Sequence, residues 1–229
     1  MKKNILIIGG SSGIGFEIVK ILHNQHNLFI ANRTNESLAE FNHKFIKIDV
    51  VSETIDPNLI PESLDGLVYC PGSINLRPFR GLKPETFIED FNLNVIGAIK
   101  NIQALLKNLN QSKHSSIVLF STVAVQTGMP FHSSVSVSKG GIEGLTRSLA
   151  AELAPKISVN AIAPSIINTP LAEKFLNSES KMDRAKERHP LKKIGSPVDI
   201  ANCVIFLLKN SWITGQIIGI DGGIGSLKI

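Results

Sequence analysis

The segment Asn4–Gly15, with the sequence NILIIGGSSGIG, decides the fold that this chain is expected to adopt. Its apolar run Ile5–Ile8 is typical of a buried strand, and a helical pattern begins at Ile14. A glycine-rich turn between a strand and a helix lets the backbone approach a pyrophosphate, to which the helix N-terminus offers unpaired N–H groups. The alternative is a flexible turn without a ligand. We expect a phosphate-binding loop made by Gly9, Ser11, Ser12, Gly13, Ile14 and Gly15.

The rest of the chain repeats this alternation of short apolar runs and helical patterns. The runs are too continuous for half-exposed antiparallel strands and suit a sheet that helices cover on both faces. Strands are expected at Ile5–Ile8, Leu28–Ala31, Phe45–Ile48, Leu67–Cys70, Ile117–Phe120, Ile157–Ala161 and Gln216–Ile220. Helices are expected after the first strand and at Thr86–Leu109, Ser138–Leu153 and Pro197–Leu208.

This order predicts one α/β domain over residues 1–229, a Rossmann fold with a doubly wound, parallel, seven-stranded sheet. No linker or internal repeat divides the chain. The segment 171–193 is polar and charged and lies between two apolar elements, so we expect it to form a mobile substrate lid.

The composition excludes several functional classes. No apolar run approaches the ~20 residues that cross a bilayer, so we expect no membrane segment and a cytoplasmic location. Cys70 and Cys203 lack the spacing of a metal site or of a disulfide framework, so we expect buried free thiols and no metal. The net charge of +5 is scattered and aromatic residues are few, which argues against nucleic acid and suits an anionic cofactor or substrate.

The end of the second expected strand indicates which dinucleotide the loop would bind. An acidic residue there would bind the ribose hydroxyls of NAD, but this chain has Asn32 and Arg33, twenty residues after Gly13. An arginine can pair with the 2′-phosphate of NADP, so NADP(H) is favoured over NAD(H). A solvated surface arginine is the alternative. Asp49 could accept a hydrogen bond from the adenine amino group or could instead cap a turn.

Further motifs resemble the short-chain dehydrogenase/reductase family along nearly the whole chain, and within it the 3-oxoacyl-carrier-protein reductases. The Gly-x-x-x-Gly-x-Gly spacing of the loop is joined by matching segments at Asp49-Val50, Asn94–Gly97, Ser136–Lys139, Ser158–Pro164, Thr169, Ile213–Gln216 and Asp221–Gly223. The resemblance implies cofactor contacts from Asp49, Val50, Gly72, Asn94, Lys139, Pro164 and Thr169.

Several positions depart from the family pattern. The catalytic tyrosine of the family would lie four residues before Lys139, where this chain has Val135, which cannot donate a proton. The only tyrosine, Tyr69, stands in a segment that resembles the Asn-Asn-Ala-Gly motif of the family. The serine that usually polarises a carbonyl is Thr122, and the glycine of the Pro-Gly pair after the sixth strand is Ser165.

The resemblance implies that Lys139 holds the nicotinamide ribose, that Asn94 supports a water chain and that Thr122 orients the substrate. It therefore predicts an NADP(H)-dependent oxidoreductase acting on a carbonyl or enoyl substrate, with an acyl thioester as one candidate. His132 lies seven residues before Lys139, the Tyr-x6-Lys spacing of enoyl-carrier-protein reductases, and a histidine can donate a proton near neutral pH. A solvent-facing loop residue is the alternative for His132.

Two other interpretations of the incomplete site stay open. In the first, the chain is a non-catalytic NADP-binding or regulatory protein. In the second, it is a carbonyl reductase in which the substrate or water supplies the proton at reduced efficiency.

The expected lid and one helix indicate partners. The lid is rich in lysine and arginine, which could attract the phosphates of coenzyme A or an acidic carrier protein, but a solvated amphipathic helix is the preferred explanation of these charges. Gly140, Gly144 and Ser148 form a stripe of small residues on one expected helix. The resemblance implies a homodimer or homotetramer through this helix and the one near Thr86–Leu109, and close packing of the helix against its own sheet is the alternative.

Overall fold

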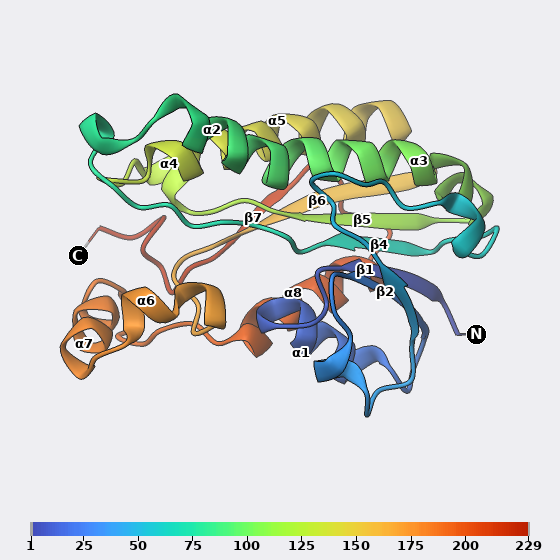
Figure 1. Cartoon of the computed structure of the whole chain (residues 1–229), viewed down its shortest axis with the longest axis horizontal. Coiled ribbons are helices and arrows are strands. Elements are labelled where there is room, and N and C mark those ends of the chain that lie inside the picture. Colours follow the sequence, from blue (N-terminus) through green and yellow to red (C-terminus); the bar gives the residue numbers. More distant parts are fainter. Residues whose placement is uncertain (1, 229) are drawn as a thin grey trace.

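The structure is a computed structural model that describes residues 2–228 (Figure 1). Within these residues, seven parallel strands form one sheet in the order β3-β2-β1-β4-β5-β6-β7, as the Rossmann prediction requires. The strands are β1 (Asn4–Ile8), β2 (Asn27–Asn32), β3 (Lys44–Lys47), β4 (Gly66–Tyr69), β5 (Ser115–Phe120), β6 (Ile157–Pro164) and β7 (Ile217–Ile220). The strand order reverses between β1 and β4, so a ligand crevice is expected at their carboxyl ends.

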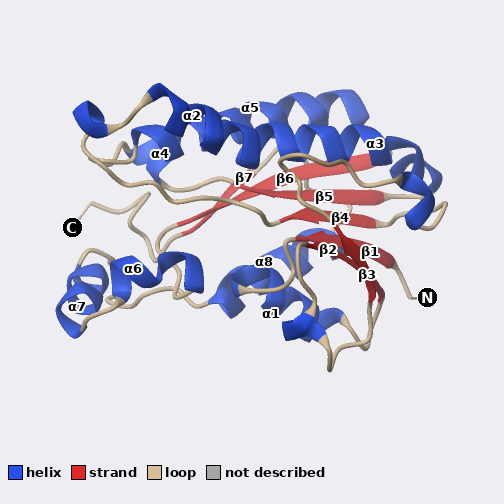
Figure 2. Cartoon of the chain, in the orientation of Figure 1, coloured by secondary structure: helices blue, strands red, loops and turns tan. Residues whose placement is uncertain are grey.

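Helices cover both faces of the sheet (Figure 2). One face carries α1 (Gly13–Leu22) and α8 (Pro197–Lys209), and the other carries α2 (Pro84–Phe91), α3 (Gly97–Gln111), α4 (Ala124–Thr127) and α5 (Ser133–Leu153). The short helices α6 (Glu173–Leu176) and α7 (Glu179–Glu187) lie beyond the carboxyl ends of the strands, on the α1 and α8 side. Single 3-10 turns occur at Glu36–Leu38, Pro57–Leu59, Phe79–Gly81 and Pro170–Ala172.

The core lies in two layers because successive strand side chains point to opposite faces. In β1, Ile5 and Ile7 pack with α1 and α8, whereas Leu6 and Ile8 pack with α3 and α5. All four of these β1 side chains are buried, which explains why the strand reads as a continuous apolar run.

Three expected elements differ in detail from the structure. The single helix predicted over Thr86–Leu109 is divided into α2 and α3 by a π-helical turn at Asn92–Ile96. The helix predicted from Ser138 begins five residues earlier, at Ser133, because the hydroxyl-rich run continues the helix. The segment 171–193, for which no helix bounds were predicted, contains α6 and α7. Its mobility stays a prediction.

Membrane-spanning helices and metal-binding clusters were both unexpected from the composition. No helix within residues 2–228 is both long and apolar enough to cross a membrane. In the same part of the chain, no cluster of three or more histidine, cysteine or acidic side chains could hold a metal ion. Cys70 and Cys203 are free thiols, as predicted, but both residues are partly rather than fully buried.

Candidate active site

The predicted phosphate loop joins β1 to α1 and needs its glycines. Gly9 and Gly13 have φ values of +83° and +55°, in the left-handed region. A Cβ on Gly15 would lie 2.1 Å from the Gly9 carbonyl oxygen, so only glycine fits there. Ser12 occupies the N-cap of α1, but its side chain forms no capping hydrogen bond. The first-turn N–H groups therefore have no side-chain cap, and the geometry suits a pyrophosphate.

Thr169 lies beside this loop although it is far away in the sequence. A Cβ on Gly13 would meet the Thr169 Cβ and Cγ2 at 3.4 Å. Pro164 ends β6, at the same carboxyl edge. The fold thus brings the phosphate loop together with a residue that the resemblance implies as a cofactor contact.

The residues predicted to select the adenine half lie at the ends of β2 and β3. Arg33 is exposed and forms no salt bridge among the described residues. Asn32 is buried, and its amide nitrogen has no hydrogen-bond partner. Asp49 accepts a 3.0 Å hydrogen bond from the backbone N–H of Val51, so its side chain stabilises a turn, and its contact with adenine stays a prediction. Val50 is buried in the core layer beneath it.

The centre of the site is formed by Lys139 on α5 and Asn94 in the π-helical turn. A Cβ on Gly72 would lie 3.2 Å from Asn94 Oδ1 and 3.4 Å from Lys139 Nζ, so the two polar groups meet over this glycine. Asn94 Oδ1 is buried and has no hydrogen-bond partner. Among the described residues, no side chain or carbonyl forms a hydrogen bond with Lys139 either. Both groups therefore have hydrogen-bonding capacity left for a ribose.

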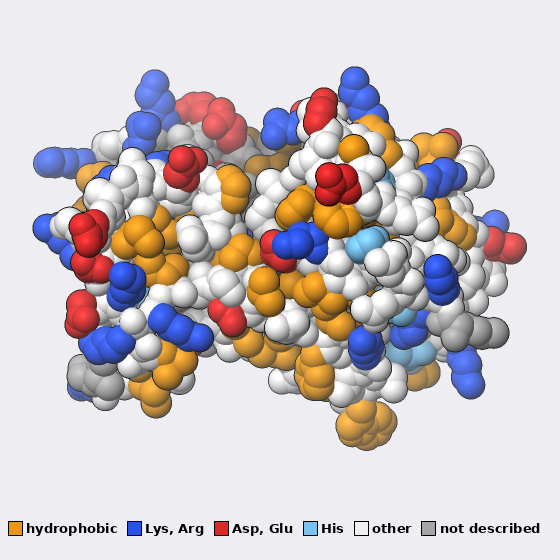
Figure 3. Space-filling model, turned by 90° about the horizontal axis from the view of Figure 1, so that it is seen from below, with side chains coloured by type: hydrophobic (Ala, Val, Ile, Leu, Met, Phe, Trp, Pro, Cys, Tyr) orange, Lys and Arg blue, Asp and Glu red, His pale blue; other side chains and the backbone are white. Residues whose placement is uncertain are grey.

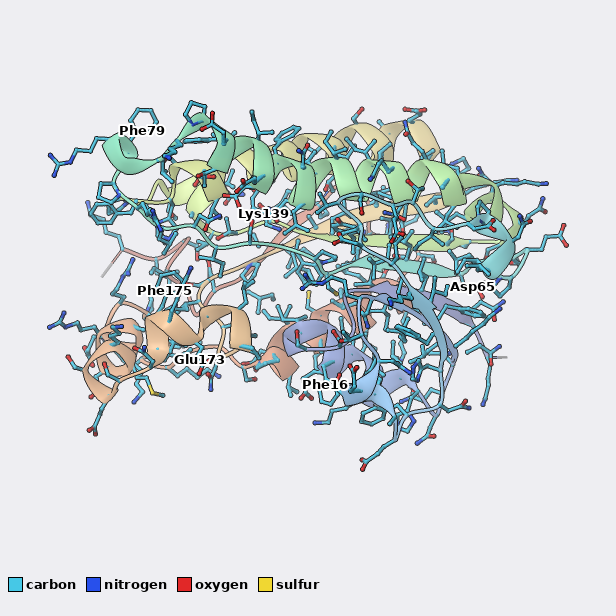
Figure 4. All side chains as sticks on the ribbon, in the orientation of Figure 1. Phe16, Asp65, Phe79, Lys139, Glu173 and Phe175 are labelled. Atoms are coloured by element: carbon cyan, nitrogen blue, oxygen red, sulfur yellow. The ribbon has the colours of Figure 1, made fainter. Side chains whose placement is uncertain are left out.

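Burial changes the pKa of the Lys139 ammonium group. The side chain lies between α5 and the sheet (Figure 4), and the residue is 8% exposed. Burial lowers the pKa of Lys139 to about 8, although Cys70 and Asp90 partly oppose this shift. Burial also raises the pKa of the neighbouring Cys70 thiol to about 12, so this sulfur stays protonated near neutral pH.

A buried carboxylate that the sequence analysis missed fixes the Asn94 amide. Asp90, on α2, accepts hydrogen bonds from Ser73 Oγ at 2.5 Å, from Asn75 Nδ2 at 2.8 Å and from Ser134 Oγ. Asn94 Nδ2 in turn donates to Ser73 Oγ at 3.1 Å and to the Asp90 carbonyl at 2.7 Å. Because the amide nitrogen is used, Oδ1 is left for the site. The available signal was an aspartate within the predicted helix Thr86–Leu109, between the aromatic residues Phe87 and Phe91.

Tyr69 has a structural position. Its hydroxyl donates a 2.6 Å hydrogen bond to the Leu93 carbonyl in the π-helical turn, and the residue is 2% exposed. Burial raises the pKa of Tyr69, so the phenol stays protonated. A Cβ on Gly97 would lie 2.3 Å from the Tyr69 hydroxyl oxygen. This pair therefore holds the turn that carries Asn94.

A cavity of about 400 Å³ adjoins this centre and brings together Thr122, His132, Val135, Ser165 and His189. Its walls are mostly apolar, and Val135 is 5% exposed. His132 is half-buried at the N-cap of α5, and its Nδ1 lies 2.7 Å from the Pro130 carbonyl oxygen. His132 is therefore only partly exposed to solvent, and part of its side chain faces the cavity.

The lid contributes the basic side of the cavity, through Lys174, Lys181, Arg184 and Arg188. Lys174 Nζ donates a 2.9 Å hydrogen bond to the Ile74 carbonyl, which joins α6 to the loop after β4. Phe175, also on α6, lines the cavity from the side opposite the α5 layer (Figure 4). On the face formed by these helices, lysine and arginine side chains gather around the α6–α7 end, with acidic side chains among them (Figure 3).

Comparisons of the sequence identify proteins that are similar to this chain. The family model described as Enoyl-(Acyl carrier protein) reductase matches residues 9–225. The 3-oxoacyl-acyl-carrier-protein reductase FabG of Rickettsia felis is 30% identical over 233 residues, with 96% of each chain covered. The FabG of Buchnera aphidicola is 27% identical over 239 residues, with 97% of each covered.

Solved structures agree as well. "ElxO with NADP Bound" has a TM-score of 0.88 and 29% identity, and the match covers 99% of this chain and 100% of that one. A short chain dehydrogenase family protein of Francisella tularensis has a TM-score of 0.90 and 29% identity, with the same coverage. The sequence match, the sheet order and the loop geometry lead to one conclusion: this chain belongs to the short-chain dehydrogenase/reductase family.

Proposed function

We propose that the chain is an NADP(H)-dependent oxidoreductase that reduces a carbonyl or enoyl substrate, with an acyl thioester as the favoured class. The observation that carries the proposal is the meeting of Lys139 Nζ and the unpartnered Asn94 Oδ1 over Gly72. Relatives described as 3-oxoacyl-acyl-carrier-protein reductases support the thioester class. A related structure described as holding NADP supports the cofactor.

The proposed roles follow from the hydrogen-bonding capacity of each side chain. Bound NADPH would supply a hydride, and the loop Gly9–Gly15 would hold its phosphates. The Lys139 ammonium donates to the ribose hydroxyls, and Asn94 Oδ1 accepts from a ribose hydroxyl or a water. Thr122 lines the cavity and donates its hydroxyl to the substrate oxygen. His132 lines the same cavity and is the candidate proton donor that its spacing from Lys139 suggests.

The preference for NADP(H) rests on Arg33 and Asn32 at the end of β2. The exposed guanidinium has no acidic partner among the described residues, so it is available to a 2′-phosphate. Asp49 and Val50 would flank the adenine, Pro164 and Thr169 the nicotinamide.

The test is consumption of NADPH, followed by absorbance, with N-acetylcysteamine thioesters of acetoacetate and crotonate as keto and enoyl probes. We expect turnover of one probe by the wild type. Lys139→Ala should lower kcat/KM by about 100-fold or more, because the variant lacks the cationic donor. Equal rates for wild type and Lys139→Ala would refute the assigned role of this centre.

A non-catalytic NADP-binding protein is the second candidate, and one observation favours it. Val135 lines the cavity, and the resemblance of the sequence places the catalytic tyrosine of the family at this position, where valine offers no phenol. This candidate predicts NADPH binding without consumption of either probe, and a binding constant that Val135 substitutions leave unchanged.

We also propose a cytoplasmic homodimer or homotetramer in which α5 contributes to the subunit contact. A Cβ on Gly144 would meet no atom within 4 Å, so the small-residue stripe is open rather than packed against its own sheet. Light scattering should give a dimer or tetramer mass for the wild type, and Gly144→Arg should shift it toward the monomer. A monomeric wild type would contradict the proposal.

A further inference from the structure

Ser165 and His189 form a hydrogen-bonded pair in the wall of the cavity. Ser165 follows β6 directly, and His189 lies just after α7. Ser165 Oγ and His189 Nε2 are 2.8 Å apart, and His189 Nδ1 is 2.6 Å from the Ala185 carbonyl oxygen. Both ring nitrogens of His189 therefore have protein partners, and the residue is only 3% exposed.

These contacts determine where the protons lie. A carbonyl oxygen only accepts hydrogen bonds, so Nδ1 carries a proton in either charge state of the ring. In the neutral ring, Nε2 holds a lone pair and the Ser165 hydroxyl donates to it. In the imidazolium, Nε2–H donates to Ser165 Oγ, and the hydroxyl proton becomes free for another acceptor. The pair can therefore pass a proton outward through the serine.

The pair faces the place where a substrate would react. Ser165 and His189 line the same cavity of about 400 Å³ as Thr122 and Val135. Thr122 Oγ1 lies 3.4 Å from the carbonyl oxygen of Pro164, the residue before Ser165, so both hydroxyl groups belong to one wall. Ser165 thus brings a hydroxyl group to the cavity, whereas Val135 brings no hydrogen-bond donor to it.

We propose that Ser165 donates the proton of the reduction and that His189 resupplies it, an assignment that rests on the proposed function. The substrate oxygen or α-carbon, made basic by hydride from the reduced nicotinamide, takes the Ser165 hydroxyl proton as that O–H bond breaks. Ser165 Oγ then takes the Nε2 proton of the imidazolium, which leaves neutral His189 with its proton on Nδ1. A solvent proton restores the imidazolium. Ser165 is the catalytic residue, and His189 is a positioning residue that acts through it.

His132 is the competing donor in the same cavity. Its Nδ1 is 2.7 Å from the Pro130 carbonyl oxygen and therefore carries a proton. The neutral His132 ring has only a lone pair at Nε2, so it must be protonated before it can donate there. His189 must likewise be protonated, but its proton reaches the substrate through Ser165. Among the described residues no side chain forms a hydrogen bond with His132 that could resupply it, which favours the pair.

Kinetics with the two thioester probes separate the candidates. We expect Ser165→Ala and His189→Gln to lower kcat by about 100-fold, the low end of what a positioned acid contributes, with KM and NADPH affinity within about twofold. Ser165→Thr should recover part of the rate, and His132→Ala, the variant of the competing donor, should lose less rate than Ser165→Ala. Unchanged kcat in Ser165→Ala, or a large loss in His132→Ala alone, would overturn the assignment and leave the reductase standing.

An NMR readout tests the pair without turnover. In ¹⁵N-labelled protein, the His189 ring should be protonated at Nδ1 and hydrogen-bonded at Nε2. Adding NADP⁺ with the acetoacetate thioester gives a complex that cannot react, and the Nε2 resonance should shift as the serine hydroxyl turns to the substrate. Ser165→Ala should abolish this shift but bind NADP⁺ normally. A wild-type resonance that ignores the ligands overturns the relay, whereas failure to bind either nucleotide refutes the reductase and the relay together.

Discussion

The phosphate loop and the substrate cavity lie at the same edge of the sheet, but they are built differently. The loop is one continuous segment whose backbone makes the site, and its glycines are required by close approaches such as that of Gly15 to the Gly9 carbonyl. The cavity is made by side chains from separate segments, including Thr122 after β5, Val135 on α5, and Ser165 and His189 around the lid. Backbone geometry constrains which residues can form the phosphate loop. In the substrate cavity, by contrast, a single side-chain substitution can change the chemistry without altering the fold.

The substitution with the largest expected effect is Gly15→Val, in the phosphate loop. Its Cβ would be placed 2.1 Å from a backbone oxygen, so the loop must move. We expect NADPH affinity to fall by about 100-fold or more, equivalent to roughly 3 kcal/mol. The matched control is Gly81→Ala, whose Cβ would meet nothing within 4 Å and which should leave binding unchanged. Fluorescence titration and thermal unfolding of both variants measure this; normal binding by Gly15→Val would contradict the loop assignment.

Placing a phenol in the substrate cavity tests whether the cavity can orient a proton donor at position 135. Val135→Tyr should raise kcat for the acetoacetate thioester by about 100-fold, because a phenol beside Lys139 is a stronger acid than the Ser165 hydroxyl, whose contribution is at the low end for a positioned acid. Val135→Phe brings the ring without the hydroxyl and should give no such gain. A steady-state comparison decides; equal rates in the two variants would mean that the cavity does not orient a donor at this position.

Lys139 connects the two halves, and its burial has a cost in stability. Its pKa is about 8 in the folded chain, against 10.5 for an ordinary lysine, so the folded state binds fewer protons between these values. Stability should rise with pH through this window and be lowest below pH 8. Lys139→Met should stabilise the cofactor-free protein at pH 7 by about 2 kcal/mol, and the difference should shrink toward pH 10. Urea unfolding at both pH values checks the sign; a destabilised variant at pH 7 would contradict it.

The smallest expected effect concerns cofactor choice. Arg33→Asp should shift the NADPH-to-NADH affinity ratio toward NADH by about 10-fold, since the charge-assisted contact to the 2′-phosphate is replaced by repulsion. Arg80→Asp, with the same charge change at another exposed arginine, is the control. Titration with both nucleotides measures the ratio, and a ratio that changes equally in the two variants would assign the effect to net charge.

The same contrast explains what the sequence could predict. The seven apolar runs predict the seven strands because a strand covered on both faces must be apolar throughout. The phosphate loop was predictable because its turn, spacing and flanking elements are contiguous. The π-helical turn was not, since it depends on Tyr69 donating to the Leu93 carbonyl across 24 positions of sequence. Ser165 was visible as a departure from the family, but its contact with His189 needs the lid folded against β6.

The most direct test of the central claim is titration of the wild type with NADPH and NADH, followed by nicotinamide fluorescence. The claim is that the cofactor half of the site is intact while the proton donor has been replaced. The predicted result is saturable binding of NADPH, tighter than that of NADH, and its loss in Gly15→Val. Binding of neither nucleotide by the folded wild type would contradict the account.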